Sequence, residues 1–565
     1  MHHPARSYLA SLFVSLVLVF ATSAWAEVDY AAVSDDKQGA VATVHPVATQ
    51  AGINALEQGG NAIDAAIAAA LTLGVVDGHN SGIGGGLFAL VYWADGRVEA
   101  IDAREMAPAK AHRDMYVRDG KVDKSLSKTG ALAMGIPGSV AAFEYLSKKG
   151  GKLEFSQLLL PAADVAEQGF AIDKIYAKRI ARHVKTLQQY PGSAEVLLNG
   201  EGQAWPAGHK LVQKDLAETY RGIARDGAAY FYRGEFAKTT AEWMQANQGL
   251  ISREDFANYH LAIREPVRSQ YGDYTLYGFP PPSSGGVHVA QILQMLSHFD
   301  LNKADEAKRY HLLGEAMKLA FADRAHWLGD PDFAKVPRGL TDAGYTKELA
   351  GMINTESATA VASHHQPPNA DVDLFGKHTT HISAADKAGN WVAITTTVNT
   401  NFGSKVIIPG TGVIMNNQMD DFSAQPGVPN AYGLVGTEAN SIQPGKRPLS
   451  SMSPTIIVKD KRPVMTVGAA GGPTIITQVV QAIVNHLTLG KPLYDAIDTP
   501  RVHQQWKPDR LFVEGKMPAQ TKQALASKGH QLKTMGPYGS TTAIAVDNNG
   551  EFVAVSEPRL RVRNR

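Results

Sequence analysis

A predicted β-hairpin centred on Ala388 constrains the fold of this chain more than any other stretch. Two strand-like runs, Ile382–Ala385 and Trp391–Asn399, flank a turn that contains Asp, Gly and Asn. With this centre, Thr379 and Thr397 are each nine residues from Ala388 and face each other. Directly opposed residues of an antiparallel pair have Cβ atoms about 5 Å apart. The pairing depends on the register, because a slip of one residue turns the partner to the other face.

Thr379 has two interpretations. A threonine hydroxyl needs a nearby base to become a nucleophile, and the free α-amino group of the same residue is one known solution. Thr379 has such an amine only if the chain is cut between His378 and Thr379. The alternative is an ordinary strand start rich in β-branched residues, which strand propensity explains without any chemistry.

The N-terminus has the features of an export signal. Arg6 precedes the apolar run Leu9–Ala21, and Ala24–Ala26 offers the small residues that a signal peptidase requires. The run is shorter than the about 20 apolar residues of a membrane span, although an uncleaved anchor is the alternative. We therefore expect residues 1–26 to be a signal peptide, and the mature chain to begin at Glu27 and to be periplasmic or secreted without a stable membrane anchor.

Composition excludes several classes of protein. The chain of 565 residues is 44% hydrophobic and contains no cysteine, so we expect a globular protein held by its core, without disulfides or cysteine nucleophiles. A net charge of +1 and the absence of a long basic run argue against nucleic acid. The basic segment Arg559–Arg565 is expected to be an exposed last strand or tail. We predict no catalytic metal, since histidines such as His364–His365 have no carboxylate or further histidine at ligand spacing.

Two motif matches are rejected. The glycine-rich string Asp77–Gly86 leads into the strand-like run Leu87–Tyr92, whereas a dinucleotide loop has G-x-G-x-x-G spacing and leads into a helix. Its glycines instead suggest that two backbones approach closely beside a site. Ser125–Gly130 contains the S-x-x-K and K-T-G strings of penicillin-binding enzymes. The strings overlap by one lysine, although those enzymes place them on separate elements, so this match is accidental.

Further patterns predict secondary structure in the second half of the chain. Tyr271–Gly278 is strand-like, and Val406–Ile408 and Gly412–Met415 are predicted to be short strands. Glu306–Leu328 and Thr474–Leu489 are predicted to be helices.

Other strings place polar or glycine residues near these elements. Arg104 ends a strand pattern, and a structural salt bridge with Asp102 or Glu105 is the alternative to a binding role. Asn416–Phe422 is rich in amide and carboxylate side chains. Gly468–Gly472 lies between a strand and a helix, where backbone N–H groups can stabilise an anion.

Taken together, these strings resemble the γ-glutamyltranspeptidases, members of the N-terminal nucleophile hydrolases. The resemblance covers nearly all of the mature chain, and its specific strings are Asp102–Glu105, Thr379–His381, Asn416–Phe422, Arg447–Pro454 and Gly471–Gly472. It implies an α+β fold, the four-layer αββα sandwich with mostly antiparallel sheets, formed as one intertwined unit.

The resemblance implies that the precursor cuts itself before Thr379. Residues 27–378 would then form a large subunit and residues 379–565 a small one. Thr379 would attack first the peptide bond before it and later the substrate amide, helped by its own amine and by Thr397. No cofactor is implied.

The resemblance also implies a pocket for a γ-glutamyl group, whose α-carboxylate and α-ammonium share one carbon. Arg104 can bind the carboxylate through two parallel hydrogen bonds, and Asp421 can pair with the ammonium. The other implied residues are Ser450 and Ser451 beside Arg104, Asn399 and Gln418 beside Asp421, Gly471 and Gly472 as the oxyanion hole, and Tyr432 in a loop that covers the bound group.

The implied activity is cleavage of γ-glutamyl amides such as glutathione through a γ-glutamyl–Thr379 ester, with transfer of the acyl group to water, amino acids or peptides. One alternative is a cephalosporin or glutaryl acylase on the same scaffold, whose acyl group lacks an α-amino group and has no use for Asp421. The other is an exported protein that binds γ-glutamyl compounds without turnover and needs no chain cut.

Overall fold

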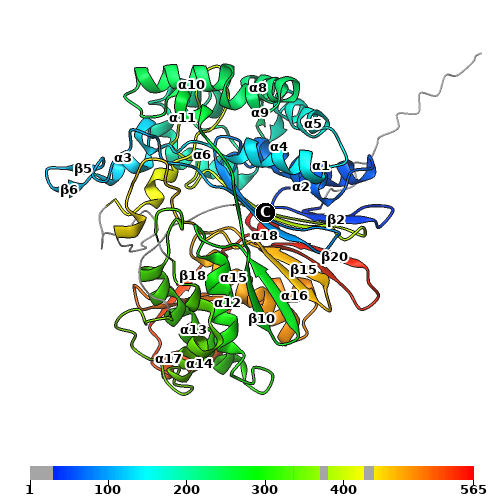
Figure 1. Ribbon diagram of the computed structural model, residues 1–565, viewed down its shortest axis with the longest axis vertical. Coiled ribbons are helices and arrows are strands. Elements are labelled where there is room, and N and C mark those ends of the chain that lie inside the picture. Colours follow the sequence, from blue (N-terminus) through cyan, green and yellow to red (C-terminus); the bar gives the residue numbers. More distant parts are fainter. Residues whose placement is uncertain (1–28, 335, 369–379, 425–437, 565) are drawn as a thin grey trace, which may run out of the picture.

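The computed structural model describes residues 29–334, 336–368, 380–424 and 438–564. Two antiparallel sheets lie face to face in its centre, and a layer of helices covers the outer side of each sheet (Figure 1). Each sheet buries one face against the other sheet and the opposite face against helices. The predicted four-layer αββα sandwich is confirmed.

The first sheet has seven strands. Their spatial order is β1 (Ala31–Val33), β2 (Gly39–Ala42), β12 (Thr380–Asp386), β13 (Trp391–Thr397), β3 (Gly86–Tyr92), β4 (Val98–Ala103) and β9 (Ala262–Arg264). The predicted hairpin is formed by β12 and β13, with Thr380 opposite Thr396 and Ala385 opposite Trp391. This is the register expected for a turn centred on Ala388, which is confirmed up to Thr380.

The glycine-rich string lies where β3 meets β13. Gly86 pairs with Thr397 across these two strands. A Cβ atom on Gly85 would lie 1.8 Å from the carbonyl oxygen of Thr397, and one on Gly84 would lie 2.1 Å from the carbonyl oxygen of Ile414. No side chain fits in these spaces, so the close backbone approach predicted from the glycines is confirmed.

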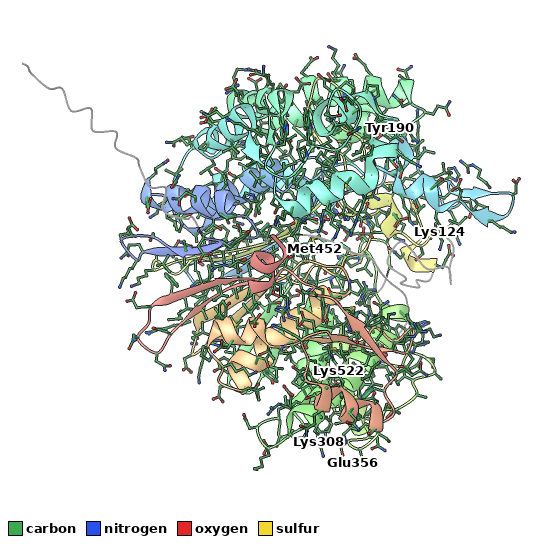
Figure 2. The ribbon with its side chains drawn as sticks, turned by 180° about the vertical axis from the view of Figure 1, so that it is seen from behind. Lys124, Tyr190, Lys308, Glu356, Met452 and Lys522 are labelled. Carbon is green, nitrogen blue, oxygen red and sulfur yellow. The ribbon has the colours of Figure 1, made fainter. Side chains whose placement is uncertain are left out.

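The second sheet has six strands. Their order is β10 (Val267–Tyr271), β11 (Tyr274–Gly278), β14 (Thr455–Lys459), β15 (Arg462–Gly468), β19 (Thr542–Val546) and β20 (Phe552–Ser556). The run Tyr271–Gly278, predicted to be one strand, therefore contains a turn between β10 and β11. The apolar core between the two sheets includes Phe88, Phe279 and Met452, the last of which is labelled in Figure 2.

The upper helical layer in Figure 1 packs on the first sheet. Its helices are α1 (Pro46–Glu57), α2 (Ala62–Val76), α4 (Ser139–Gly150), α5 (Phe155–Gln168), α6 (Lys174–Leu187), α8 (Lys214–Asp226), α9 (Ala228–Tyr232) and α10 (Glu235–Ala246). Every residue of α2 is buried, which its alanine-rich sequence permits. Asn61 caps α2, and Asp64 completes a capping box.

The lower helical layer packs on the second sheet. Its helices are α12 (Gly285–Leu296), α13 (Glu306–Trp327), α14 (Ala343–Gly351), α15 (Thr474–Ile483), α16 (Leu493–Asp498) and α17 (Ala519–Ser527). The prediction for α13 is confirmed within one residue, whereas α15 gives way to the π-helical turn Val484–Thr488. Lys308 and Glu356, labelled in Figure 2, form an ion pair of 2.9 Å at the outer end of this layer.

Smaller elements border the four layers. They are helices α3 (Lys124–Lys128), α7 (Pro191–Leu197) and α11 (Arg253–Ala257), the strand pairs β5 (Val117–Arg118) with β6 (Lys121–Val122) and β7 (Phe170–Ala171) with β8 (Lys210–Leu211), and the sheet of β16 (Val502–His503), β17 (Leu511–Glu514) and β18 (Leu532–Met535). Within the described ranges, none of the helices has the length and apolar character needed to cross a membrane.

The predicted strands Val406–Ile408 and Gly412–Met415 are wrong. In place of a strand pair, the segment has a single bridge between Ile407 and Ile414. Left-handed backbone at positions such as Lys405, with a φ of 69°, bends the chain before a ladder can extend.

The expectation of an exposed C-terminal strand or tail is also wrong. The segment forms helix α18 (Pro558–Asn564), and Arg559 is buried. Its guanidinium donates to Glu514 at 2.5 Å and to Glu557 at 2.8 Å. These two carboxylates neutralise the charge of Arg559, so its guanidinium can lie inside the fold.

Candidate active site

Arg104 and Asp421 lie in contact although 317 positions separate them in the chain. Arg104 follows β4, and Asp421 ends the 3₁₀ helix Gln418–Asp421. Nη2 of Arg104 donates to Oδ2 of Asp421 at 2.6 Å, and Nε2 of Gln418 donates to the same oxygen at 3.1 Å. All three side chains are buried. Three of the predicted binding residues therefore form one buried polar cluster.

The orientation of Arg104 is set by several neighbours. Its Nε donates to the carbonyl oxygen of Pro448 at 2.8 Å, and its Nη1 lies 3.4 Å from Oε2 of Glu105. The Asp102 carboxylate binds the guanidinium of Arg264 at 2.6 Å. From Arg104 it accepts the backbone N–H and not the side chain. The predicted salt bridge of Arg104 is thus confirmed with Glu105, and the one with Asp102 is wrong. Burial raises the pKa of Glu105 to about 7, although Arg104 lowers it.

Ser450 and Ser451 follow directly after the carbonyl groups that hold Arg104. The hydroxyl of Ser450 accepts the backbone N–H of Met452 at 3.1 Å. The carbonyl oxygen of Ser450 accepts the backbone N–H of Ser284 at 2.8 Å, which links this segment to the start of α12. Both serines are buried. They therefore lie in a rigid turn at the edge of the Arg104 cluster.

Arg324 is a buried cation that the sequence analysis did not identify. It lies on α13, where its Nε donates to Oγ of Ser284 at 2.9 Å and its Nη2 donates to Oγ of Ser451 at 2.8 Å. Burial lowers the pKa of Arg324 to about 9, and Asp421 opposes this shift. An arginine near the end of a long helix has no distinguishing sequence pattern, because its neighbours here come from distant segments.

Thr397 and Asn399 lie at the end of β13. Oγ1 of Thr397 accepts the backbone N–H of Asn399 at 2.7 Å. Asn399 has a φ of 74°, and its Nδ2 donates to the carbonyl oxygen of Asn417 at 2.9 Å. Its buried Oδ1 has no hydrogen-bond partner among the described residues. Asn399 therefore joins the strand end to the segment that carries Gln418 and Asp421.

Gly471 and Gly472 form the turn before α15. Their φ angles are 127° and 69°, in the region that favours glycine. A Cβ atom on Gly471 would lie 2.7 Å from Oγ1 of Thr474. The backbone N–H groups of this turn thus belong to a strand–helix connection of the kind that binds anions.

A cavity of about 290 Å³ connects several of these groups. Thr380, Asn399 and Gly471 all lie on its wall, although they come from β12, the end of β13 and the turn before α15. Asp77, another wall residue, accepts a hydrogen bond from Oγ1 of Thr380 at 3.0 Å. Burial raises the pKa of Asp77 to about 7. The sequence analysis noted the string beginning at Asp77 only for its glycines.

Three predicted site residues lie outside the described residues: Thr379, His378 and Tyr432. The nucleophile, the cleavage site and the covering loop therefore stay predictions. The described part of the chain contains no group of three His, Asp or Glu side chains placed to hold a metal ion.

The comparison with known families decides the classification. The sequence profile of the gamma-glutamyltranspeptidases matches residues 48–563. The chain belongs to this family. The glutathione hydrolase proenzyme of Escherichia coli (strain K12) is 42% identical over 527 residues, which are 93% of this chain and 90% of that protein.

Acylases also resemble this member of the γ-glutamyltranspeptidase family. The acylase ACY 1 proenzyme of Pseudomonas sp. (strain V22) is 37% identical over 533 residues, and the match covers 92% of each chain. The crystal structure of a cephalosporin acylase from Bacillus halodurans matches with a TM-score of 0.84 and 27% identity, covering 99% of this chain and 98% of that one. The chain is therefore similar both to a protein named as a glutathione hydrolase and to proteins named as acylases.

Proposed function

We propose that this chain is a self-processing enzyme that cleaves γ-glutamyl amides such as glutathione and transfers the acyl group to water, amino acids or peptides. The observation that carries the proposal is the buried cluster of Arg104, Asp421 and Gln418, in which a cation and an anion lie 2.6 Å apart. A γ-glutamyl group has a carboxylate and an ammonium on one carbon, so its pocket needs a cation and an anion that are close neighbours. Membership of the family supports the reaction class.

Substrate binding exchanges one ion pair for two. The α-carboxylate takes the place of Asp421 beside Arg104, where a guanidinium can donate two parallel hydrogen bonds. The α-ammonium then pairs with Asp421, and the amide oxygens of Gln418 and Asn399 are acceptors for its remaining protons. Every buried charge stays paired during this exchange, which avoids the cost of several kcal/mol of an uncompensated buried ion.

Maturation uses the hydroxyl of Thr379, which later attacks the substrate. Oγ of Thr379 attacks the carbonyl carbon of His378, the peptide C–N bond breaks, and the hydroxyl proton passes to the nitrogen. Water then hydrolyses the resulting ester, leaving a carboxylate on His378 and a free amine on Thr379. The products are a large subunit of residues 27–378, after export and loss of the signal peptide 1–26, and a small subunit of residues 379–565.

The mature enzyme repeats this chemistry on its substrate. The amine of Thr379 accepts the proton from its own Oγ, which attacks the γ-carbonyl carbon, and the leaving amine takes that proton. The N–H groups of Gly471 and Gly472 stabilise the oxyanion, and removal of one such donor typically costs about 3 kcal/mol of barrier. Thr397 supports Thr379 from the opposite strand, and the loop with Tyr432 covers the acyl group. Water or an amine then attacks the ester and releases the γ-glutamyl group from Thr379.

Two chromogenic substrates test the choice between γ-glutamyl transfer and acylase activity. We expect hydrolysis of γ-glutamyl-p-nitroanilide to exceed that of glutaryl-p-nitroanilide at least a hundredfold in kcat/KM, because glutaryl has no ammonium for Asp421. Asp421→Asn should bring the kcat/KM values of the two substrates closer together. A preference for glutaryl-p-nitroanilide would support the acylase instead.

Intact masses test the processing. Active material should contain two chains that begin at Glu27 and Thr379, and Thr379→Ala should give one uncut chain. Active protein in which residues 378 and 379 are still joined would contradict the proposed mechanism, and an intact protein that binds γ-glutamyl compounds without turnover would be a binding protein.

A further inference from the structure

We propose that Lys405 is a positioning residue of the γ-glutamyl pocket, and that it orients Asn399 so that the amide oxygen of Asn399 faces the α-ammonium of the donor. The inference rests on the proposed function and adds a residue that the sequence analysis did not identify. Lys405 acts through Thr400 and Asn417, which connect its side chain to Asn399 by hydrogen bonds.

Lys405 ends a tight turn that follows β13. Within this turn φ is positive at Asn399, Phe402, Gly403 and Lys405, with values between 49° and 74°. Side chains other than that of glycine rarely adopt this conformation. The groups around the turn therefore have to hold it in place, and turns of this kind often carry functional residues.

The amine of Lys405 closes the turn. Its Nζ donates to Oγ1 of Thr400 at 2.9 Å and to the carbonyl oxygen of Gly403 at 2.5 Å. The side chain is buried, burial lowers the pKa of Lys405 to about 7, and Asp420 opposes this shift. The ammonium and the neutral amine both have enough N–H groups for the two bonds. Because burying an amine is more costly than burying an apolar side chain, its hydrogen bonds are the reason to expect a role here.

Thr400 connects the amine of Lys405 to Asn417. The backbone N–H of Thr400 donates to Oδ1 of Asn417 at 3.0 Å, and Oγ1 of Thr400 lies 3.1 Å from the same oxygen. The carbonyl oxygen of Gly403, at 3.2 Å, already accepts Lys405, so we assign the hydroxyl proton of Thr400 to Asn417. Nδ2 of Asn417 donates to the carbonyl oxygen of Lys128 at 3.0 Å. Both ends of the Asn417 amide are therefore fixed.

Asn417 in turn fixes the amide of Asn399. The carbonyl oxygen of Asn417 accepts Nδ2 of Asn399 at 2.9 Å, and the backbone N–H of Asn417 donates to the carbonyl oxygen of Val398 at 3.2 Å. Since a carbonyl oxygen only accepts, the amide nitrogen of Asn399 faces Asn417 and the amide oxygen faces away. That oxygen is buried and has no partner among the described residues. An unpaired buried acceptor is costly, and the α-ammonium of the donor supplies the missing proton.

Two donors separate positioning from a general loss of structure. γ-Glutamyl-p-nitroanilide has the α-ammonium, whereas glutaryl-p-nitroanilide lacks it. Lys405→Met keeps the length of the side chain and removes its donors. In this variant kcat/KM for the γ-glutamyl donor should fall about tenfold more than for the glutaryl donor, mainly through KM. Lys405→Arg should keep part of the preference. Equal losses for the two donors, or no loss, would overturn the proposal.

Lys318→Met is the matched control for this experiment. Lys318 is also buried and its Nζ also donates to a backbone carbonyl oxygen, that of Thr359 at 2.7 Å, but it lies on α13 and contacts none of the γ-glutamyl pocket residues. We expect this variant to be less stable and to keep the ratio of the two kcat/KM values. An equal fall of the ratio in Lys318→Met would mean that any buried lysine has this effect, and would overturn the role of Lys405.

Variants of Thr400 test the same connection if Lys405→Met does not fold. Thr400→Val keeps the shape and removes the hydroxyl, so it should reproduce the loss of preference, whereas Thr400→Ser should retain the preference. Combining Thr400→Val with Asn399→Ala should cost no more than Asn399→Ala alone, because Thr400 acts through Asn399. Additive losses, or a Thr400→Val enzyme with the full preference, would overturn the positioning role.

The unaltered enzyme distinguishes this inference from the proposed function. If it releases no p-nitroaniline from γ-glutamyl-p-nitroanilide, the proposed function and the role of Lys405 both fail. If it prefers the γ-glutamyl donor and the variants keep that preference, only the role of Lys405 fails.

Discussion

Oγ1 of Thr380 donates a hydrogen bond of 3.0 Å to Oδ2 of Asp77, across 303 positions of the chain. Asp77 is the C-cap of α2, and Thr380 begins β12. The bond therefore holds the strand directly after the proposed cut against the upper helical layer. After processing it would link the two subunits, one residue from the new N-terminus.

The Asp77 carboxyl should make stability depend on pH. Burial raises its pKa to about 7 in the folded chain, against about 3.9 when unfolded. The folded state thus binds this proton more tightly, and the free energy of unfolding falls as the pH rises from about 4 to about 7. Asp77→Asn removes this contribution, so the variant should gain stability relative to the parent across that window, by a few kcal/mol at most.

This measurement is best made in the Thr379→Ala background, where a single chain unfolds and subunit dissociation does not enter. Urea midpoints at four pH values between 4 and 7 give the difference between parent and variant. A difference that stays constant, or that shifts toward the parent as the pH rises, would show that Asp77 does not titrate in this window.

Replacement of Arg104 should weaken donor binding. Arg104→Ala removes a charge-assisted contact worth about 1.5–3 kcal/mol, which corresponds to an about 10- to 150-fold higher KM for γ-glutamyl-p-nitroanilide. Arg104→Lys should recover only part of this loss, since an ammonium cannot donate in the bidentate geometry. Arg253→Ala, at an exposed arginine on α11, is the control. An Arg104→Ala enzyme with an unchanged KM would place Arg104 outside the donor pocket.

The approach of Gly85 to Thr397 leaves no room for a side chain. A methyl group at Gly85 would lie 1.8 Å from a backbone oxygen of β13. Gly85→Ala should therefore lower the free energy of unfolding by about 3 kcal/mol or more, and slow the chain cut because the strand opposite Thr379 must shift. Gly351→Ala, with nothing within 4 Å of the new Cβ, should change stability by less than about 1 kcal/mol. Denaturant unfolding and a timed denaturing gel compare the two, and similar stability for both variants would refute the prediction.

The C-terminal helix should contribute to stability through Arg559. Arg559→Ala leaves the buried Glu514 without its guanidinium partner, and breaking a buried pair in this way costs about 3–5 kcal/mol. Arg561→Ala removes an exposed ion pair with Asp29 and should cost at most about 1 kcal/mol. Thermal unfolding of the two variants measures the contrast. Equal midpoints would mean that the tail is the peripheral segment expected from its composition.

Sequence alone determined the features that depend on residues close together in the chain. The register of β12 with β13 followed from the position of one turn. The close approach of two backbones at the glycines before β3 was also predictable, because so many glycines in one string indicate positions where a side chain does not fit. For Arg104 and Asp421, the sequence placed both residues in one pocket only through family resemblance, and their ion pair came from the structure.

Tertiary structure decided what distant residues do together. The basic C-terminus was misassigned because Glu514, which neutralises Arg559, lies 45 positions earlier in the chain. Arg324 and the cavity beside Asp77 have no local pattern at all, since their neighbours meet only when the layers pack. Burial then lowers the pKa of Arg324 and raises the pKa of Asp77. Composition and spacing do not describe these shifts, because the charge of a group in a low-dielectric interior depends on the partners that the fold places beside it.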